Sequence, residues 1–168
     1  QIPGLDFITE SKRFYPMKTL AAQVIGFCGT DGEGLEGLEY YYNPFLSGQK
    51  SSWTVFRDAL GRSFQTEATP VIGQDGYDLV LTIDKNIQHS AQTALQESVE
   101  KFAARSGIAV VMNASTGAIL AMAHVPEFNP NTFSRYEAWW RRNRAVTDCF
   151  EPGSAFKIFL TATAIESG

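Results

Sequence analysis

The sequence predicts an α+β protein in two parts, residues 1–76 and residues 77–168. In the first part, frequent glycines separate short apolar stretches, which predicts an elongated, mostly β unit joined by tight turns. The pattern changes after the glycine-containing break Gly73–Gly76. Longer periodic segments follow, and they predict a helix, a β-hairpin and a final helix that form part of an α+β domain.

The first part is expected to hold short strands between its turns. Three glycines break up the stretch Asp31–Glu39, and Thr54–Arg57 is one predicted strand. The charged residues Arg13, Glu39 and Asp58 lie among these turns. We expect them to tie the turns together through ion pairs and backbone hydrogen bonds rather than to bind a ligand.

The second part opens with a predicted strand, Tyr77–Ile83, followed by Asp84, a residue type that often caps a helix. Apolar residues then keep helical spacing at Ile87, Ala91, Ala94, Leu95, Val99, Phe102 and Ala103. Arg105–Gly107 are expected to end this helix. Two short apolar strands, Ile108–Met112 and Ala118–Ala123, are separated by a loop of turn-forming residues and predict a hairpin.

Composition and residue clusters argue against several classes of function. The net charge of −4 indicates no particular partner, and the stretch Trp139–Arg144 is interpreted as a partly buried segment rather than a nucleic-acid site. Neither histidine lies in a cluster with Cys or Asp/Glu that is typical of a metal site. Cys149 could act as a nucleophile with His89 or His124 as its base, but a plain buried cysteine is the favoured interpretation.

The first residues and the apolar runs of the sequence indicate where in the cell the protein could lie. No secretory signal opens the chain, and no apolar run approaches the roughly 18 residues of a membrane span. The sequence therefore predicts either a cytosolic protein or the soluble portion of a longer one.

The stretch Glu151–Lys157 carries the clearest indication of chemistry. Pro152 and Gly153 mark a turn and a helix start, and Ser154 lies three positions before Lys157. Side chains with this spacing share one face of a helix. The residues that follow are almost all apolar, which predicts a buried helix in which an unpaired lysine is costly.

This spacing suits nucleophilic catalysis. A serine hydroxyl is a weak nucleophile until a base removes its proton, and a lysine can be that base when burial favours its neutral form. N–H groups at the helix start can also help to stabilise an oxyanion. The pattern alone is not decisive, because it recurs in polar surroundings at Ser47/Lys50 and Ser98/Lys101. A buried helix with a lysine that reaches solvent has the same pattern.

Several motifs resemble those of class B penicillin-binding proteins, the D,D-transpeptidases that cross-link bacterial peptidoglycan. The stretch Arg142–Asp148 and the following Glu151–Lys157 resemble the first active-site region of that family. The sequence of this region most resembles the septal, cell-division branch. Further motifs follow the family's order upstream, namely Leu81–Asp84, Thr116–Met122 and Asn129–Asn131, and, resembling the non-catalytic pedestal, Arg13–Pro16, Gly34–Glu39 and Arg57–Gly61.

The resemblance implies a pedestal (dimerisation-type) domain over residues 1–76 and the start of a penicillin-binding/β-lactamase-like transpeptidase domain over residues 77–168. It implies that Lys157 deprotonates Ser154, that Ser154 attacks D-Ala-D-Ala stem peptides of peptidoglycan, and that β-lactam antibiotics acylate the same serine. It also implies a membrane-anchored protein of the bacterial inner membrane that faces the periplasm. Its partners would be membrane proteins of the division machinery, with no nucleic acid and no cofactor.

The sequence departs from the family pattern in two ways. The family's Ser-x-Asn and Lys-Thr-Gly motifs do not occur, and Ala155 stands where threonine is frequent. We therefore expect the chain to be a piece of a transpeptidase that does not react with penicillin by itself. Two other interpretations stay open: a serine β-lactamase or β-lactam sensor, against which the pedestal-like first part argues, and a non-catalytic interaction module of the division machinery.

Overall fold

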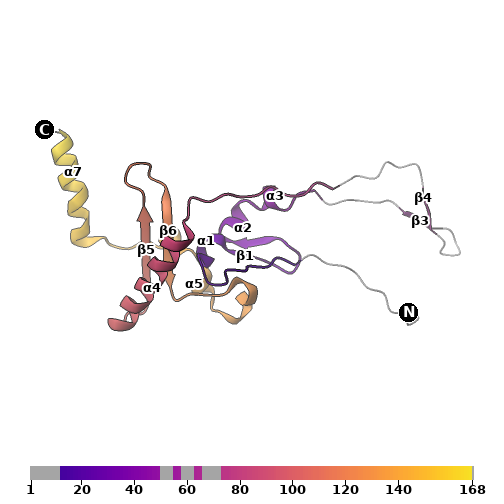
Figure 1. Cartoon of the computed structure of the whole chain (residues 1–168), viewed down its shortest axis with the longest axis horizontal. Helices are drawn as coiled ribbons and strands as arrows, with labels where there is room; N and C mark the ends of the chain where they lie inside the picture. The colour runs from indigo at the N-terminus through magenta and orange to yellow at the C-terminus, as the bar shows by residue number, and fades with distance from the viewer. Residues whose placement is uncertain (1–11, 50–54, 58–62, 66–72, 168) are drawn as a thin grey trace.

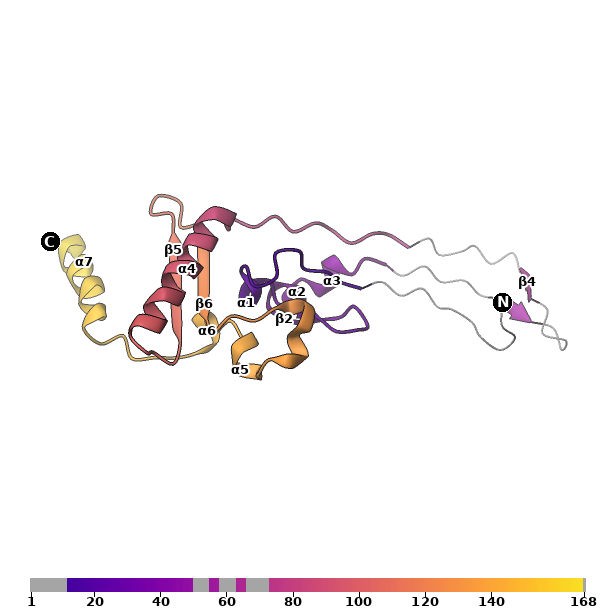
Figure 2. The ribbon, with the colours of Figure 1, turned by 60° about the horizontal axis from the view of Figure 1, so that its bottom comes forward.

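The computed structural model of the chain describes residues 12–49, 55–57, 63–65 and 73–167. Its elements are spread along one long axis, with the strands β3 (Val55–Arg57) and β4 (Ser63–Gln65) near one end and the helix α7 (Lys157–Ser167) at the other (Figures 1 and 2). Helices and strands are mixed along the chain, as the predicted α+β class requires. None of the described helices combines the length and the apolar character needed to cross a bilayer.

Among its described residues, the first part holds more helix than the mostly β unit that the sequence predicts. One small antiparallel sheet is formed by β1 (Phe27–Cys28) and β2 (Gly34–Glu36). Three short helices accompany it, namely α1 (Ala22–Ile25), α2 (Gly37–Tyr41) and α3 (Asn43–Leu46). A proline in the first turn of α3 is one reason for the difference, since its fixed φ favours a helix start.

Two expectations for the first part are confirmed where the structure describes them. The predicted strand at Thr54–Arg57 corresponds to β3, which pairs antiparallel with β4, whereas Thr54 lies outside the described residues. The guanidinium Nε of Arg13 lies 2.7 Å from Oε1 of Glu39. The expected ion pair is thus present, and it joins the segment before Tyr15 to α2 rather than one turn to another. Asp58 lies outside the described residues.

The predicted strand Tyr77–Ile83 is wrong. The segment forms no strand, and hydrogen bonds hold it near its two ends. The Tyr77 amide donates to the carbonyl of Phe45 at 2.9 Å, and the Thr82 hydroxyl donates to the carbonyl of Ile119 at 2.6 Å. A β-prone sequence forms a strand only when a neighbouring strand pairs with it, and no described strand does so here.

A helix packed on a hairpin forms the main unit of the second part. The helix α4 (Lys85–Lys101) begins as predicted, because Oδ1 of Asp84 accepts hydrogen bonds from the amides of Asn86 and Ile87. The strands β5 (Gly107–Met112) and β6 (Ile119–Val125) form the predicted antiparallel hairpin. A Cβ on Gly107 would lie 2.8 Å from a methyl of Val99, so glycine allows the helix to approach the strand closely.

The hydrophobic core joins the two predicted parts. Tyr15, Ala22 and Phe27 from the first part pack with Phe128, which follows β6. The ring of Phe27 also stacks on Phe133 with centroids 4.3 Å apart. The core therefore lies across both parts, and the boundary near residue 76 stays a prediction.

Candidate active site

Ser154 and Lys157 lie where a 3₁₀ turn, η2 (Gly153–Phe156), runs into α7. Gly153 has a φ of +54°, which glycine adopts readily, and this lets the chain turn sharply into Ser154. The backbone N–H of Lys157 donates to the carbonyl of Ser154. Side chains three residues apart overlap along a 3₁₀ turn, so this local fold favours the side-by-side placement that the sequence predicts.

The serine helix is exposed, which differs from the buried helix expected from its apolar sequence. Ser154 and Lys157 are exposed, and no hydrogen bond joins their side chains in the part of the chain that the structure describes. The exposed apolar side chains are Phe156, Ile158, Phe159, Leu160 and Ile165. The difference has a simple cause: among the described elements, α7 has its one extensive contact with η2, and it stands apart from the hairpin in Figure 1.

Ion pairs stabilise the segment that precedes η2, which we call the serine turn (Gly153–Phe156). Asp148 follows the short helix α6 (Arg144–Thr147), and its carboxylate accepts from Arg142 at 2.9 Å and from Arg144 at 3.1 Å. Desolvation acts to raise the pKa of Asp148, but hydrogen bonds from Arg144 and Thr147 and the charge of Arg142 outweigh it and lower that pKa. Arg144 also donates to the hydroxyl of Ser106 at 3.0 Å, which fixes α6 to the start of β5.

The strand β6 holds the other side of the same segment. Nε2 of His124 accepts a hydrogen bond from the backbone amide of Ala145 at 3.3 Å, and the Asn143 amide donates to Sδ of Met122 at 3.4 Å. His124 is only 4% exposed. Burial, assisted by the charge of Arg144, lowers the pKa of His124 from 6.5 to about 4, so the imidazole is neutral at physiological pH.

Sequence reasoning did not assign the roles of His124 and Asn143 in this arrangement. The one signal for His124 is a lone polar residue in an otherwise apolar strand, which requires a hydrogen-bond partner when it is buried. Its partner lies 21 residues away on α6, and strand periodicity gives no information about that pairing.

The structure tests the expectations for the aromatic, basic stretch Trp139–Arg144 and for Cys149. Trp139 and Trp140 lie in the helix α5 (Ala138–Arg141) and are half-buried, which confirms the expected partly buried segment. The expectation of a buried Cys149 is wrong, because this thiol is exposed between α6 and η2. His124, one of its suggested bases, uses Nε2 to bind Ala145, and the other, His89, is exposed on α4.

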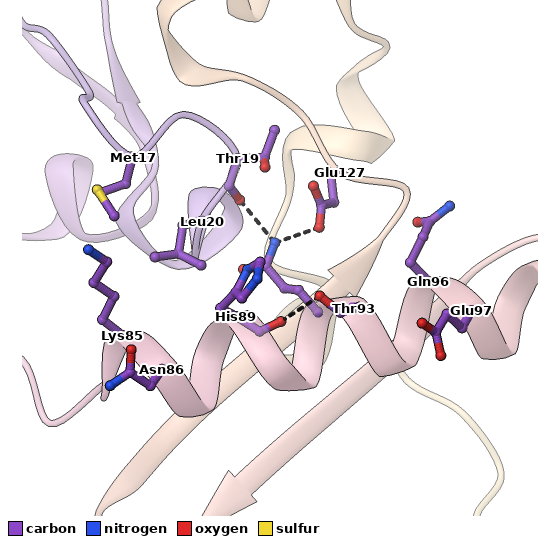
Figure 3. A pocket seen from close by; sticks show the side chains of 11 residues that line it. Met17, Thr19, Leu20, Lys85, Asn86, His89, Thr93, Gln96, Glu97 and Glu127 are labelled. Atoms are coloured by element: carbon purple, nitrogen blue, oxygen red, sulfur yellow. Dashed lines mark hydrogen bonds between the residues drawn. The ribbon is translucent and has the colours of Figure 1, made fainter.

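A groove on the described surface lies away from the serine turn. Its volume is about 770 Å³, and it is bounded by the loop Met17–Leu20 and by α4 (Figure 3). Gln92 crosses it, because Nε2 donates both to the carbonyl of Thr19 at 3.2 Å and to Glu127 at 2.6 Å. Neither Ser154 nor Lys157 lines this groove, and no group of three metal-ligating side chains occurs among the described residues.

Comparison with known protein families covers most of the chain. Residues 1–81 match the penicillin-binding protein dimerisation domain, and residues 107–168 match the penicillin-binding protein transpeptidase domain. The chain belongs to the penicillin-binding proteins. The two matches occur in the order that the sequence motifs predict.

Relatives of known sequence agree with this assignment. The chain is 43% identical over 164 residues to the probable peptidoglycan D,D-transpeptidase PenA of Neisseria gonorrhoeae, which covers 96% of the chain and 28% of that relative. It is 36% identical over 168 residues to the peptidoglycan D,D-transpeptidase FtsI of Escherichia coli K12, covering 100% of the chain and 28% of that relative. The chain thus spans less than a third of the length of these relatives.

A solved structure has the same fold. The structure of penicillin-binding protein 3 from Mycobacterium tuberculosis in its apo form superposes with a TM-score of 0.78 at 34% identity, and the match covers 94% of this chain and 32% of that one. Other structures of that protein contain aztreonam or ampicillin.

Proposed function

We propose that the complete protein is a peptidoglycan D,D-transpeptidase in which Ser154 is the nucleophile and Lys157 the general base. The observation that carries the proposal is the position of this pair. Both residues lie where η2 runs into α7, within the stretch matched by the transpeptidase domain. The dimerisation-domain match upstream distinguishes this arrangement from a serine β-lactamase, in agreement with the pedestal-like motifs of the sequence.

The proposed reaction transfers an acyl group in two steps and needs no cofactor. Nζ of neutral Lys157 takes the proton of Ser154, and Oγ attacks the carbonyl of the penultimate D-Ala of a stem peptide. The tetrahedral intermediate collapses, its C–N bond breaks, and the terminal D-Ala leaves as an amine after accepting a proton. An amine of a neighbouring stem then attacks the serine ester, forms the cross-link and restores the hydroxyl. A β-lactam follows the first step and remains bound to the serine.

The proposal also covers the cellular location of the protein and its role in cell division. The sequence of Asn143–Asp148 most resembles that of the septal branch, and the relatives of this chain include FtsI. We therefore propose a role in cell division at the inner membrane, facing the periplasm, with division-machinery membrane proteins as partners. A purely non-catalytic interaction module is the alternative.

The test uses the complete protein and a synthetic stem peptide that ends in D-Ala-D-Ala. We expect release of free D-Ala by the wild type and none by Ser154→Ala. Ser98→Ala is a matched control, because Ser98 belongs to a second Ser-x-x-Lys pattern and donates to the carbonyl of Ala94 on the exposed face of α4. Equal D-Ala release by the wild type and Ser154→Ala would overturn the assignment, and a folded wild type without any release would favour the interaction module.

A further inference from the structure

The segment that leads to Ser154 is anchored on the hairpin by a small number of polar contacts. On one side, Arg144 binds Ser106 at the start of β5 and pairs with Asp148. On the other side, His124 of β6 accepts the amide of Ala145. Between Asp148 and η2 the chain has no helix or strand, so these contacts fix the last regular element before the serine turn.

The contact between His124 and Ala145 requires a neutral imidazole. A backbone N–H is a donor, so Nε2 must offer its lone pair, and the proton of the neutral ring is therefore on Nδ1. Protonation at Nε2 would place two N–H groups against each other. The environment opposes protonation, because the side chain is 4% exposed.

The groups around His124 come from three elements. Across the hairpin, the residue paired with His124 is the apolar Ile108, and from α4 the uncharged Gln88 binds the backbone of the neighbouring Met122. The side chain of Asn143 and the backbone of Met122 favour the protonated ring, whereas Arg144 on α6 is the charged group that opposes it. No carboxylate contributes to the balance at this histidine.

We propose that His124 is a positioning residue for Ser154, in which the neutral imidazole holds the amide of Ala145 and thereby fixes the segment Asn143–Asp148 that enters the serine turn. Only the effect of His124 on the reactivity of Ser154 rests on the proposed function. The anchoring itself is a property of this chain. When His124 is protonated or replaced by a side chain without an acceptor, α6 loses the hydrogen bond from the Ala145 amide to β6, and the segment that enters the serine turn is held less firmly.

The first test measures the anchor directly, by amide hydrogen exchange in the 168-residue chain. His124→Leu removes the acceptor and keeps an apolar side chain, whereas His124→Gln places an amide oxygen where Nε2 lies and does not titrate. We expect the Ala145 amide to exchange roughly tenfold faster in His124→Leu, the loss of an ordinary hydrogen bond, and at nearly the wild-type rate in His124→Gln. The Met122 amide, bound by Oε1 of Gln88 at 2.7 Å, is the internal reference.

A second measurement needs no variant and so does not depend on whether His124→Leu folds. In the wild-type chain, Ala145 exchange relative to Met122 is expected to accelerate as the pH falls toward about 4, where the imidazole becomes charged. The same ratio should stay constant in His124→Gln. Unchanged Ala145 exchange in His124→Leu, or a pH-independent ratio in the wild type, would overturn the proposal.

The catalytic consequence is tested in the complete protein by the rate of penicillin acylation. We expect His124→Leu to acylate roughly tenfold more slowly and His124→Gln to recover most of the rate, because only the first variant loses the acceptor. If Ala145 exchange responds but both variants acylate at the wild-type rate, His124 does not position the serine, although the proposed function stands. If the wild type is not acylated at all, the proposed function fails, whereas the exchange result still decides the anchor.

Discussion

Tyr15 and Asn131, which lie 116 residues apart in the sequence, exchange two hydrogen bonds. The Asn131 side chain accepts from the Tyr15 amide at 2.9 Å and donates to the Tyr15 carbonyl at 2.8 Å. One amide side chain thus satisfies both backbone groups of a buried residue, as a neighbouring strand would. Because Tyr15 belongs to the core shared with Phe128, this pair ties the loop after β6 to the first part of the chain.

Replacing this asparagine should loosen the junction. Asn131→Ala leaves the backbone N–H of buried Tyr15 without its partner, whereas the Tyr15 carbonyl keeps the Lys18 amide at 3.2 Å. We expect a loss of about 2 kcal/mol in the free energy of unfolding. Urea unfolding of the chain measures this loss. Asn86→Ala, an exposed asparagine near the start of α4, is the matched control and should change stability by less than about 0.5 kcal/mol. Equal effects of the two substitutions would contradict the role of the pair.

The stability of the chain should depend on pH through His124. Its pKa is about 4 in the folded chain against 6.5 ordinarily, so between these values the unfolded state binds more protons. Stability contributed by the neutral ring is therefore lost as the pH falls from about 6.5 to about 4, by up to about 3 kcal/mol. Urea unfolding at a series of pH values should show this slope in the wild type and not in His124→Gln. Parallel slopes in the two proteins would contradict the burial of a neutral histidine.

Local signals in the sequence predict the helix–hairpin unit well. Asp84 is a strong cap followed by apolar residues at helical spacing, and the turn before Gly117 closes two apolar strands, so each element is determined by its own residues. Tyr77–Ile83 fails as a strand because pairing requires a neighbour that the local sequence does not specify. The spacing of Ser154 and Lys157 singles them out only together with the Pro-Gly turn and the apolar run around them, since it recurs twice elsewhere. The bond between His124 and Ala145 depends on tertiary packing.

The assignment of Lys157 as the base predicts a specific loss of acylation. In the complete protein, Lys157→Arg keeps the charge and the approximate length, but arginine does not give up its proton and cannot deprotonate Ser154. We expect no acylation by penicillin and an unchanged thermal unfolding midpoint. Lys101→Arg, in the second Ser-x-x-Lys pattern, should acylate normally. A Lys157→Arg protein that acylates at the wild-type rate would remove Lys157 from the mechanism.

The 168-residue chain alone should not form a penicillin adduct. In the described structure the serine turn is open to solvent, and no element lies over α7 to enclose the reacting carbonyl or to supply an oxyanion donor from the opposite side. Loss of a single such donor typically slows acyl transfer by about a hundredfold or more. Incubation with excess labelled penicillin and gel fluorography measures the adduct. A stoichiometric adduct on this chain would show that the serine turn is competent without further elements.

The most direct test of Ser154 as the nucleophile is intact-mass spectrometry of the complete protein after incubation with penicillin, followed by peptide mapping. We predict one covalent adduct per molecule, located on the peptide that contains Ser154 and absent from Ser154→Ala. An adduct that persists in Ser154→Ala, or that maps to another residue such as the exposed Cys149, would contradict the account.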